Sequence, residues 1–177
     1  LIEQGVNVLE NGEMLDARAV SALRILIAEA RADGYPVYVC SGYRSYETQR
    51  IIYQRHIDQY MQQGMTRQQA DAATLLAVNA PGGSEHQLGL AVDLFDKMYY
   101  PPLSYSTMNQ KFFEYLDSIC YQYGFIKRYP TRKLLLTGWD EPWHYRYVGV
   151  EVATFITEQN LCYEEFSHSV EKQELAV

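Results

Sequence analysis

The stretch SEHQLGLAVD, residues 84–93, passes from a loop into a β-strand. Gly89 permits a tight turn, and strict alternation along the strand directs Val92 into the core and Asp93 to the opposite face. An aspartate in the middle of an apolar strand is costly unless another group compensates its charge. Together with His86 it could bind a metal ion, or the two side chains could simply form a hydrogen bond. The segment alone leaves both interpretations open.

A second segment, GWDEPWHYRYVG at 138–149, favours the metal. The proline after Glu141 keeps that residue out of helical geometry, and an extended chain beyond it presents His144 on one strand face. His86, Asp93 and His144 then form a three-ligand set, which leaves the fourth position of a catalytic zinc ion open for water. Glu141 remains a spare carboxylate, suited to take a proton from that water and return it to a leaving amine.

A third segment, SGYRSYETQ at 41–49, supplies a cation. Arg44 follows a predicted strand, and loops at strand ends commonly carry functional groups. A guanidinium directed at the site could stabilise an oxyanion without binding the metal. The alternative for any arginine in a turn is a solvated surface charge.

Helix and strand patterns are mixed along the chain without regular βαβ alternation. Apolar spacing of three and four residues predicts helices over 16–34, 46–64, 66–80, 108–123 and 150–160. Short β-rich runs predict strands over 35–40, 90–95, 124–129, 133–138 and 143–149. The class is therefore α+β, with a small and mainly antiparallel sheet flanked by helices. The tyrosine-rich loop at 96–106 is a candidate lid over a peptide pocket.

Length and charge limit the function classes. The chain has 177 residues and a net charge of −7, and we expect a single domain over 1–177. The absence of a basic patch argues against nucleic-acid binding, and no apolar run approaches the ~18 residues of a membrane span. Residues 161–177 form an acidic tail to which the sequence assigns no role. The start LIEQG, without methionine, is typical of a trimmed or mature chain.

The three segments, in this order, resemble the signatures of a family of bacterial cell-wall enzymes. The pattern S-x-H-x-x-G-x-A-x-D is matched at every fixed position from Ser84 to Asp93, and E-x-W-H is matched from Glu141 to His144. The family is that of the VanY-like D-alanyl-D-alanine carboxypeptidases linked to vancomycin resistance, within the LAS metallopeptidases. The resemblance covers roughly residues 15–160 and implies the fold of the hedgehog and D,D-peptidase type.

The resemblance also implies a role for each matching position. It makes His86, Asp93 and His144 the Zn²⁺ ligands, Glu141 the general base and then acid, Arg44 the oxyanion stabiliser, and Ser84, Gln49 and Trp143 the substrate contacts. The first five agree with the roles that the chemistry of the segments suggests. A serine before a histidine and a glutamine on a helix are otherwise ordinary polar surface residues.

The expected function is zinc-dependent removal of the C-terminal D-alanine from peptidoglycan precursor stem peptides. An L,D-carboxypeptidase or a D,D-dipeptidase acting on cell-wall peptides is the alternative within the family. The alternative from another class is a non-catalytic, zinc-stabilised binding module, although zinc binding alone requires neither Glu141 nor Arg44. The expected location is extracytoplasmic, in the cell envelope, with a cytoplasmic location as the alternative.

Overall fold

A computed structural model describes residues 6–9, 11–97 and 108–172, and its centre is a four-stranded antiparallel sheet with the strand order β3-β4-β6-β5. A separate two-stranded hairpin, β1-β2, precedes it. The strands are β1 (Val6–Val8), β2 (Met14–Asp16), β3 (Tyr38–Ser41), β4 (Ala91–Phe95), β5 (Phe125–Lys127) and β6 (His144–Tyr147). The predicted α+β class with a small antiparallel sheet is confirmed.

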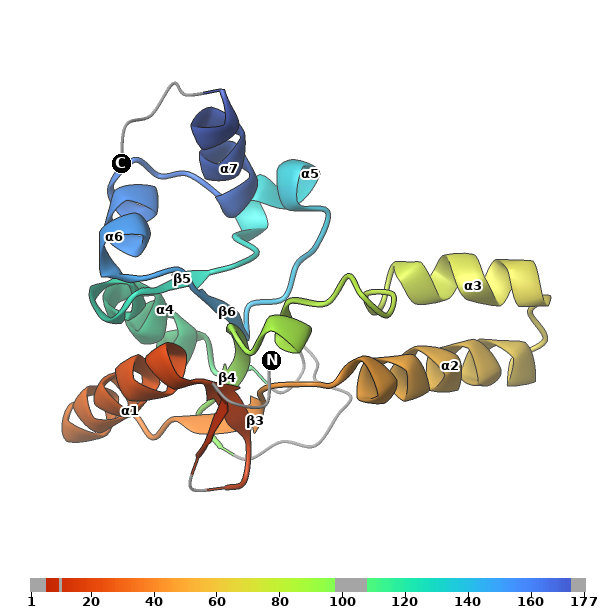
Figure 1. Cartoon of the computed structure of the whole chain (residues 1–177), viewed down its shortest axis with the longest axis horizontal. Coiled ribbons are helices and arrows are strands. Elements are labelled where there is room, and N and C mark those ends of the chain that lie inside the picture. The colour runs from red at the N-terminus through yellow and green to blue at the C-terminus, as the bar shows by residue number, and fades with distance from the viewer. Residues whose placement is uncertain (1–5, 10, 98–107, 173–177) are drawn as a thin grey trace.

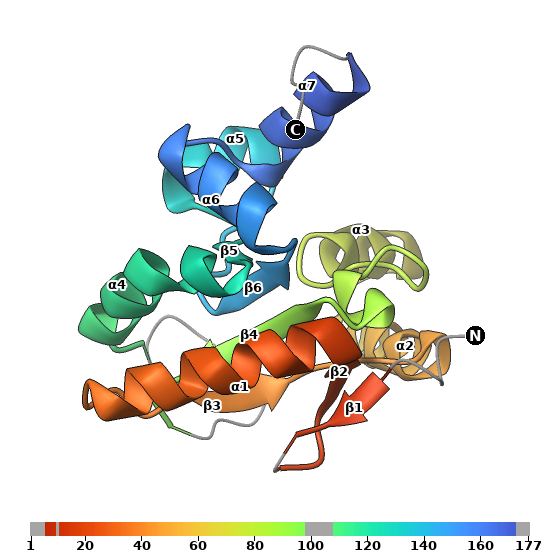
Figure 2. The same cartoon turned by 60° about the vertical axis from the view of Figure 1, so that its left-hand side comes forward.

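Helices cover the sheet and extend from it (Figures 1 and 2). The α-helices are α1 (Ala17–Ala32), α2 (Tyr46–Gln62), α3 (Arg67–Leu75), α4 (Gln110–Ile119), α5 (Leu134–Thr137), α6 (Val150–Glu158) and α7 (Tyr163–Glu171). The short 3₁₀ turns are η1 (Glu85–Leu88), η3 (Cys120–Tyr123) and η4 (Thr131–Lys133). No helix in the described ranges combines the length and the apolar character needed to cross a bilayer.

The main core lies between the sheet and α1, which runs alongside β3 and β4 in Figure 2. Helix α1 begins where the Asp16 side chain accepts a hydrogen bond from the Arg18 backbone, and it buries a stripe of small and branched residues. The buried residues of α1 are Ala19, Val20, Leu23, Leu26 and Ala30. They share one apolar cluster with Val92 and Leu94 of β4 and with residues of α4, so the predicted core face of β4 is confirmed.

Strand β4 is interior to the sheet, and all five of its residues are buried. Gly89, whose φ is 69°, turns the chain from η1 into this strand, and its carbonyl accepts a hydrogen bond from the Asp16 backbone at 2.8 Å. A Cβ at position 89 would lie 3.0 Å from that same Asp16 nitrogen, so both the backbone conformation and the close approach require glycine. The turn fixes where η1 stands relative to β4.

Helices α2 and α3 lie side by side and extend away from the sheet (Figure 1). The chain reverses between them at Gly64, whose φ is 94°, and α3 begins with a capping box between Thr66 and Gln69. Ile57 and Gln49 of α2 and Ala70 of α3 are buried. The buried side chains of α2 and α3 therefore lie mainly between the two helices.

The strand predicted over 133–138 is wrong, because this segment forms η4 and the short helix α5. A run of consecutive leucines has no period that separates a strand from a helix. Gly138, at a φ of 72°, ends the helix, and Leu135 is fully exposed. The leucines face outward, where a strand in the sheet would have buried them.

Two other features bear on the sequence predictions. The acidic tail, for which no helix is predicted, contains α7, and an ion pair between Lys133 of η4 and Glu165 joins α7 to the segment just before α5. The candidate lid tyrosines, Tyr99, Tyr100 and Tyr105, lie outside the described residues.

Candidate active site

The sheet register brings two of the predicted metal ligands together. Asp93 of β4 pairs with His144 of β6, so the two side chains emerge side by side on the sheet face opposite the main core. His86, held by η1 at the entrance to β4, completes the group. The candidate metal-binding atoms of these three buried residues all lie within 4.8 Å of one another.

The three side chains lie close enough together to share one metal ion. Asp93 Oδ2 lies 3.4 Å from His86 Nε2, and Asp93 Oδ1 lies 3.2 Å from His144 Nδ1. Ligands at zinc distances of about 2.0–2.2 Å are separated by roughly 3.3 Å in tetrahedral geometry. Two imidazoles and one carboxylate are also the donor types that zinc takes in catalytic sites.

Each imidazole has one nitrogen held by an acceptor and the other facing the cluster. His86 Nδ1 lies 2.7 Å from the Gly42 carbonyl oxygen, an acceptor only, which assigns the proton to Nδ1 and leaves Nε2 toward Asp93. His144 Nε2 lies 3.4 Å from Glu85 Oε2 and leaves Nδ1 toward Asp93. The partners thus select, in each ring, the nitrogen that would bind a metal ion.

Glu85, which sequence reasoning missed, is the carboxylate behind His144. Its Oε1 accepts a hydrogen bond from Arg128 Nε at 2.7 Å and forms an ion pair with Arg146 Nη1 at 3.1 Å. Burial raises the pKa of Glu85, but the hydrogen bond with His144 and the two guanidinium charges outweigh burial and lower the pKa to about 2. One signal was available, because the predicted strand alternation places Arg146 on the same face as His144.

Arg44 reaches the ligand atoms from the loop after β3. Its Nη2 lies 3.2 Å from Asp93 Oδ2 and 3.3 Å from His86 Nε2, and its Nε donates to Ser41 Oγ at 3.0 Å. The predicted placement of Arg44 at the site is therefore observed, and the alternative of a purely solvated charge does not hold. A cation fixed here can face an oxyanion that forms beside the cluster.

Glu141 stands at the edge of the cluster. Its Oε2 lies 3.8 Å from His144 Nδ1, and about a quarter of its side chain is exposed. Burial, opposed by His144 and supported by the charge of Asp93, raises the pKa of Glu141 to about 7. A carboxyl group with a pKa near neutrality can both accept and return a proton, which is the behaviour that a general base and acid requires.

The other predicted site residues occupy different environments. Ser84 is buried at the start of η1 and makes no capping hydrogen bond there. Gln49 is fully buried, and its amide donates to the Asn79 carbonyl at 2.7 Å. Trp143 belongs to the main core, where its ring stacks on Phe95 with centroids 5.8 Å apart.

Tyr129 places an aromatic ring beside His144, and sequence reasoning did not identify this residue as part of the site. Its ring lies 5.1 Å from the His144 ring, centroid to centroid, and Trp139 packs at 6.2 Å on Tyr129. Tyr129 is nearly fully buried and has an apolar ring, so it limits the access of water to one side of His144. No spacing in the sequence connects it with the other site residues.

A buried His-Asp-His set with a carboxylate and an arginine beside it, on one face of a small antiparallel sheet, has the donor types and charges that metal-dependent hydrolysis requires. Residues 12–150 match the family described as VanY, D-alanyl-D-alanine carboxypeptidase, and the chain belongs to this family. The predicted family is thus confirmed.

A relative and three solved structures show how close the similarity is. The chain is 47% identical over 160 residues to a D-alanyl-D-alanine carboxypeptidase of Enterococcus faecalis (strain ATCC 700802 / V583), which covers 89% of this chain and 57% of the relative. The chain thus spans little more than half the length of that curated relative.

Among solved structures, VanYB in complex with D-alanine-D-alanine is 42% identical, with a TM-score of 0.79 and coverage of 93% of this chain and 88% of that one. A Zn(II) complex of a mutant vancomycin-resistance D,D-pentapeptidase VanY is 44% identical, with a TM-score of 0.77 and coverage of 91% and 88%. The LD-carboxypeptidase LdcB is 31% identical, with a TM-score of 0.74 and coverage of 92% and 72%.

Proposed function

We propose that this protein is a zinc-dependent D,D-carboxypeptidase that removes the C-terminal D-alanine from peptidoglycan stem peptides. The observation that carries the proposal is the convergence of three metal-binding side chains, the carboxyl group of Glu141 and the guanidinium of Arg44 at one buried site. The solved relatives that hold Zn(II) and D-alanine-D-alanine support the choice of metal and substrate.

His86, Asp93 and His144 would hold the zinc ion through Nε2, a carboxylate oxygen and Nδ1. When bound, zinc supplies a Lewis acid that polarises the scissile carbonyl and makes a water molecule nucleophilic near neutral pH. Gly42 and Glu85 keep the two imidazoles in the required tautomers.

The chain's own residues provide the proton transfer and the charge stabilisation. Glu141, with its pKa near 7, takes a proton from the attacking water and gives it to the amino group of the departing D-alanine. Arg44 faces the negative charge that develops on the carbonyl oxygen, since its guanidinium already lies within 3.3 Å of two ligand side chains.

An exopeptidase must also recognise the free carboxylate at the end of its substrate. Ser84 is the better donor for this group, because its hydroxyl is not used to cap η1 and the residue precedes His86 by two positions. One N–H of the Gln49 amide already donates to Asn79, and its buried Oε1, which has no hydrogen-bond partner, is an acceptor that suits a substrate N–H group better than a carboxylate. Trp143 would contribute only a small exposed edge to the pocket.

An L,D-carboxypeptidase that trims tetrapeptide stems is the second candidate. The similarity to LdcB favours it, because the two chains superimpose over 92% of this chain. Both activities act on cell-wall peptides, so we place the protein at the extracytoplasmic face of the cell envelope, with a cytoplasmic location as the alternative.

The test is product analysis by mass spectrometry after incubation with three substrates: a pentapeptide stem ending in D-Ala-D-Ala, a tetrapeptide stem, and free D-Ala-D-Ala. The proposal expects the pentapeptide to lose one alanine and the other two substrates to remain largely intact. Cleavage of the tetrapeptide alone would establish the L,D activity, and cleavage of the free dipeptide would establish a dipeptidase. A zinc-loaded protein that cleaves none of the three would be a binding module.

A further inference from the structure

The first turn of α7 reaches back to the candidate metal site through a chain of charged groups. Glu164 Oε1 accepts a hydrogen bond from Arg128 Nη2 at 2.6 Å, and Arg128 Nε donates to Glu85 Oε1 at 2.7 Å. Glu85 Oε2 in turn lies 3.4 Å from His144 Nε2. Three contacts therefore connect the C-terminal helix to a metal-binding imidazole.

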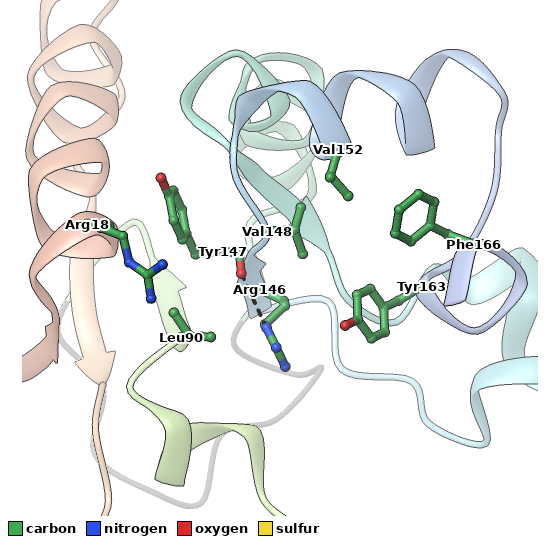
Figure 3. Close-up of a pocket in the computed structure, with 8 residues that line it drawn as sticks. All are labelled: Arg18, Leu90, Arg146, Tyr147, Val148, Val152, Tyr163 and Phe166. Atoms are coloured by element: carbon green, nitrogen blue, oxygen red, sulfur yellow. Dashed lines mark hydrogen bonds between the residues drawn. The ribbon is translucent and has the colours of Figure 1, made fainter. Parts of the chain in front are cut away.

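Tyr163 of α7 packs against Arg128 and also against Arg146, the other arginine that contacts Glu85. The Tyr163 ring lies 5.1 Å from the guanidinium carbon of Arg128 and 5.4 Å from that of Arg146. Figure 3 shows Tyr163 beside Arg146, at the edge of a cavity of about 300 Å³ that Phe166 of α7 also lines. Both guanidinium groups that hold Glu85 thus pack on one aromatic ring of α7.

The network of Glu164, Arg128 and Glu85 is largely buried, so its side chains have little freedom to move without losing hydrogen bonds. The side chains of Arg128 and Glu85 are only 10% and 14% exposed, so water can replace few of their hydrogen bonds. When one partner of a buried ion pair is removed, the other charge is left without compensation and the group shifts toward solvent. Arg128 is also tied to His144 through its backbone, whose N–H donates to the His144 carbonyl at 3.0 Å. A displacement of Arg128 would consequently be felt by both the backbone and the imidazole of His144.

We propose that Glu164 and Tyr163 are positioning residues for the metal ligand His144 and act through Arg128 and Glu85. The inference rests on the proposed metal site, but it concerns a helix that lies beyond the 12–150 range matched by the family. Helix α7 is then a working part of the site, since it fixes the orientation and the hydrogen-bond partner of one imidazole.

The chain offers a matched control on the same helix. Glu165, the next residue, pairs with Lys133 Nζ at 2.8 Å and accepts a hydrogen bond from the Cys162 backbone, and it has no contact with the arginine network. Glu165→Gln removes the same charge as Glu164→Gln and breaks an ion pair of the same helix, while the amide oxygen can still cap the Cys162 N–H. Any general effect of loosening α7 should appear in this control.

The experiment measures zinc affinity by competition with a chromophoric chelator, and the absorption spectrum of the cobalt(II)-substituted protein, in the full chain. We expect Glu164→Gln and Tyr163→Leu each to weaken zinc binding roughly 3-fold to 10-fold, below the 10-fold to 100-fold typical of groups that contact a ligand directly. Both variants should shift the cobalt spectrum, and with a D-Ala-D-Ala peptide they should lower kcat more than they raise KM. The Glu165→Gln variant should match the wild type in all three readouts.

Two results would overturn the proposal. One is a Glu164→Gln protein with wild-type zinc affinity and an unchanged cobalt spectrum, and the other is an equal loss in Glu165→Gln, which would reduce α7 to a stabilising helix. Because metal binding is measured without peptide, a wild type that binds zinc but cleaves no stem peptide would contradict the proposed function and leave this test intact. A wild type that binds no zinc would refute the site itself.

Discussion

At the scale of single residues, Glu141 is distinguished from Asp93 by its surroundings. Asp93 is buried against two imidazoles and a guanidinium, and although burial opposes ionisation, the charges of His86 and His144 hold its pKa well below the usual range. The carboxyl group of Glu141 lies 3.8 Å from His144 Nδ1, and burial, its main influence, raises its pKa to about 7. These environments support the proposed division of tasks, with Asp93 as a metal ligand and Glu141 as a proton carrier.

Replacing Glu141 by glutamine should therefore remove catalysis and leave metal binding intact. We expect Glu141→Gln to lower kcat by about 10²-fold to 10⁴-fold, the usual contribution of a general acid and base, with zinc content equal to that of the wild type. Steady-state kinetics and metal analysis of the same sample check both parts. Loss of zinc from the variant would show that Glu141 is a ligand and that its assigned role is wrong.

The lowered pKa of Glu85 predicts how the stability of the zinc-free protein depends on pH. Its pKa of about 2 in the folded protein lies below the ordinary 4.5, so its contribution to stability is complete above about pH 4.5 and is lost as the pH falls toward 2. The full effect is at most about 3 kcal/mol, from 1.36 kcal/mol per pKa unit. The free energy of unfolding in urea should differ between wild type and Glu85→Gln at pH 6, and the difference should shrink at pH 3. A difference that stays constant between these pH values would argue against the charged network.

At the scale of elements, the helices with both a clear apolar stripe and end signals were predictable from the sequence. Helix α1 has such a stripe, an aspartate at its start and Gly34 beyond its end, and residues 90–95 form a short apolar run that is interrupted only by Asp93. The sequence at 133–138 shows neither an apolar period nor the segment that it packs against. The acidic composition of residues 161–177 gave no signal for α7. Arg128 and Lys133, distant in sequence from α7, form ion pairs with its first-turn glutamates, Glu164 and Glu165, and join the helix to the rest of the fold.

The exposure of the leucines in α5 can be tested by comparison with a buried leucine of α1. Leu135 is fully exposed and Leu23 of α1 is fully buried. We expect Leu135→Ser to change the free energy of unfolding by no more than about 0.5 kcal/mol, and Leu23→Ala to lower it by about 2–5 kcal/mol. Urea denaturation of the two variants makes the comparison. A large loss in Leu135→Ser would mean that this segment is packed, as the predicted strand would have been.

At the scale of the whole molecule, the site joins segments that are far apart along the chain. Arg44, His86, Asp93, Glu141 and His144 come from the loop after β3, from η1, from β4 and from the region of β6. Sequence motifs predicted that these five residues act together, because each has a distinctive neighbourhood, and the structure brings them close to one another. Glu85, Tyr129 and the arginines behind them depend on contacts across the sheet and with α7, and no local pattern marks such contacts.

We propose that cleavage requires one zinc ion, held by His86, Asp93 and His144. The most direct measurement is a zinc titration of chelator-treated, dialysed protein, with release of D-alanine from a D-Ala-D-Ala pentapeptide as the readout. We predict no turnover without metal, and a rate that rises with added zinc and saturates at about one ion per chain, since the described residues contain one such cluster. Full turnover by rigorously metal-free protein would show that cleavage requires no metal ion.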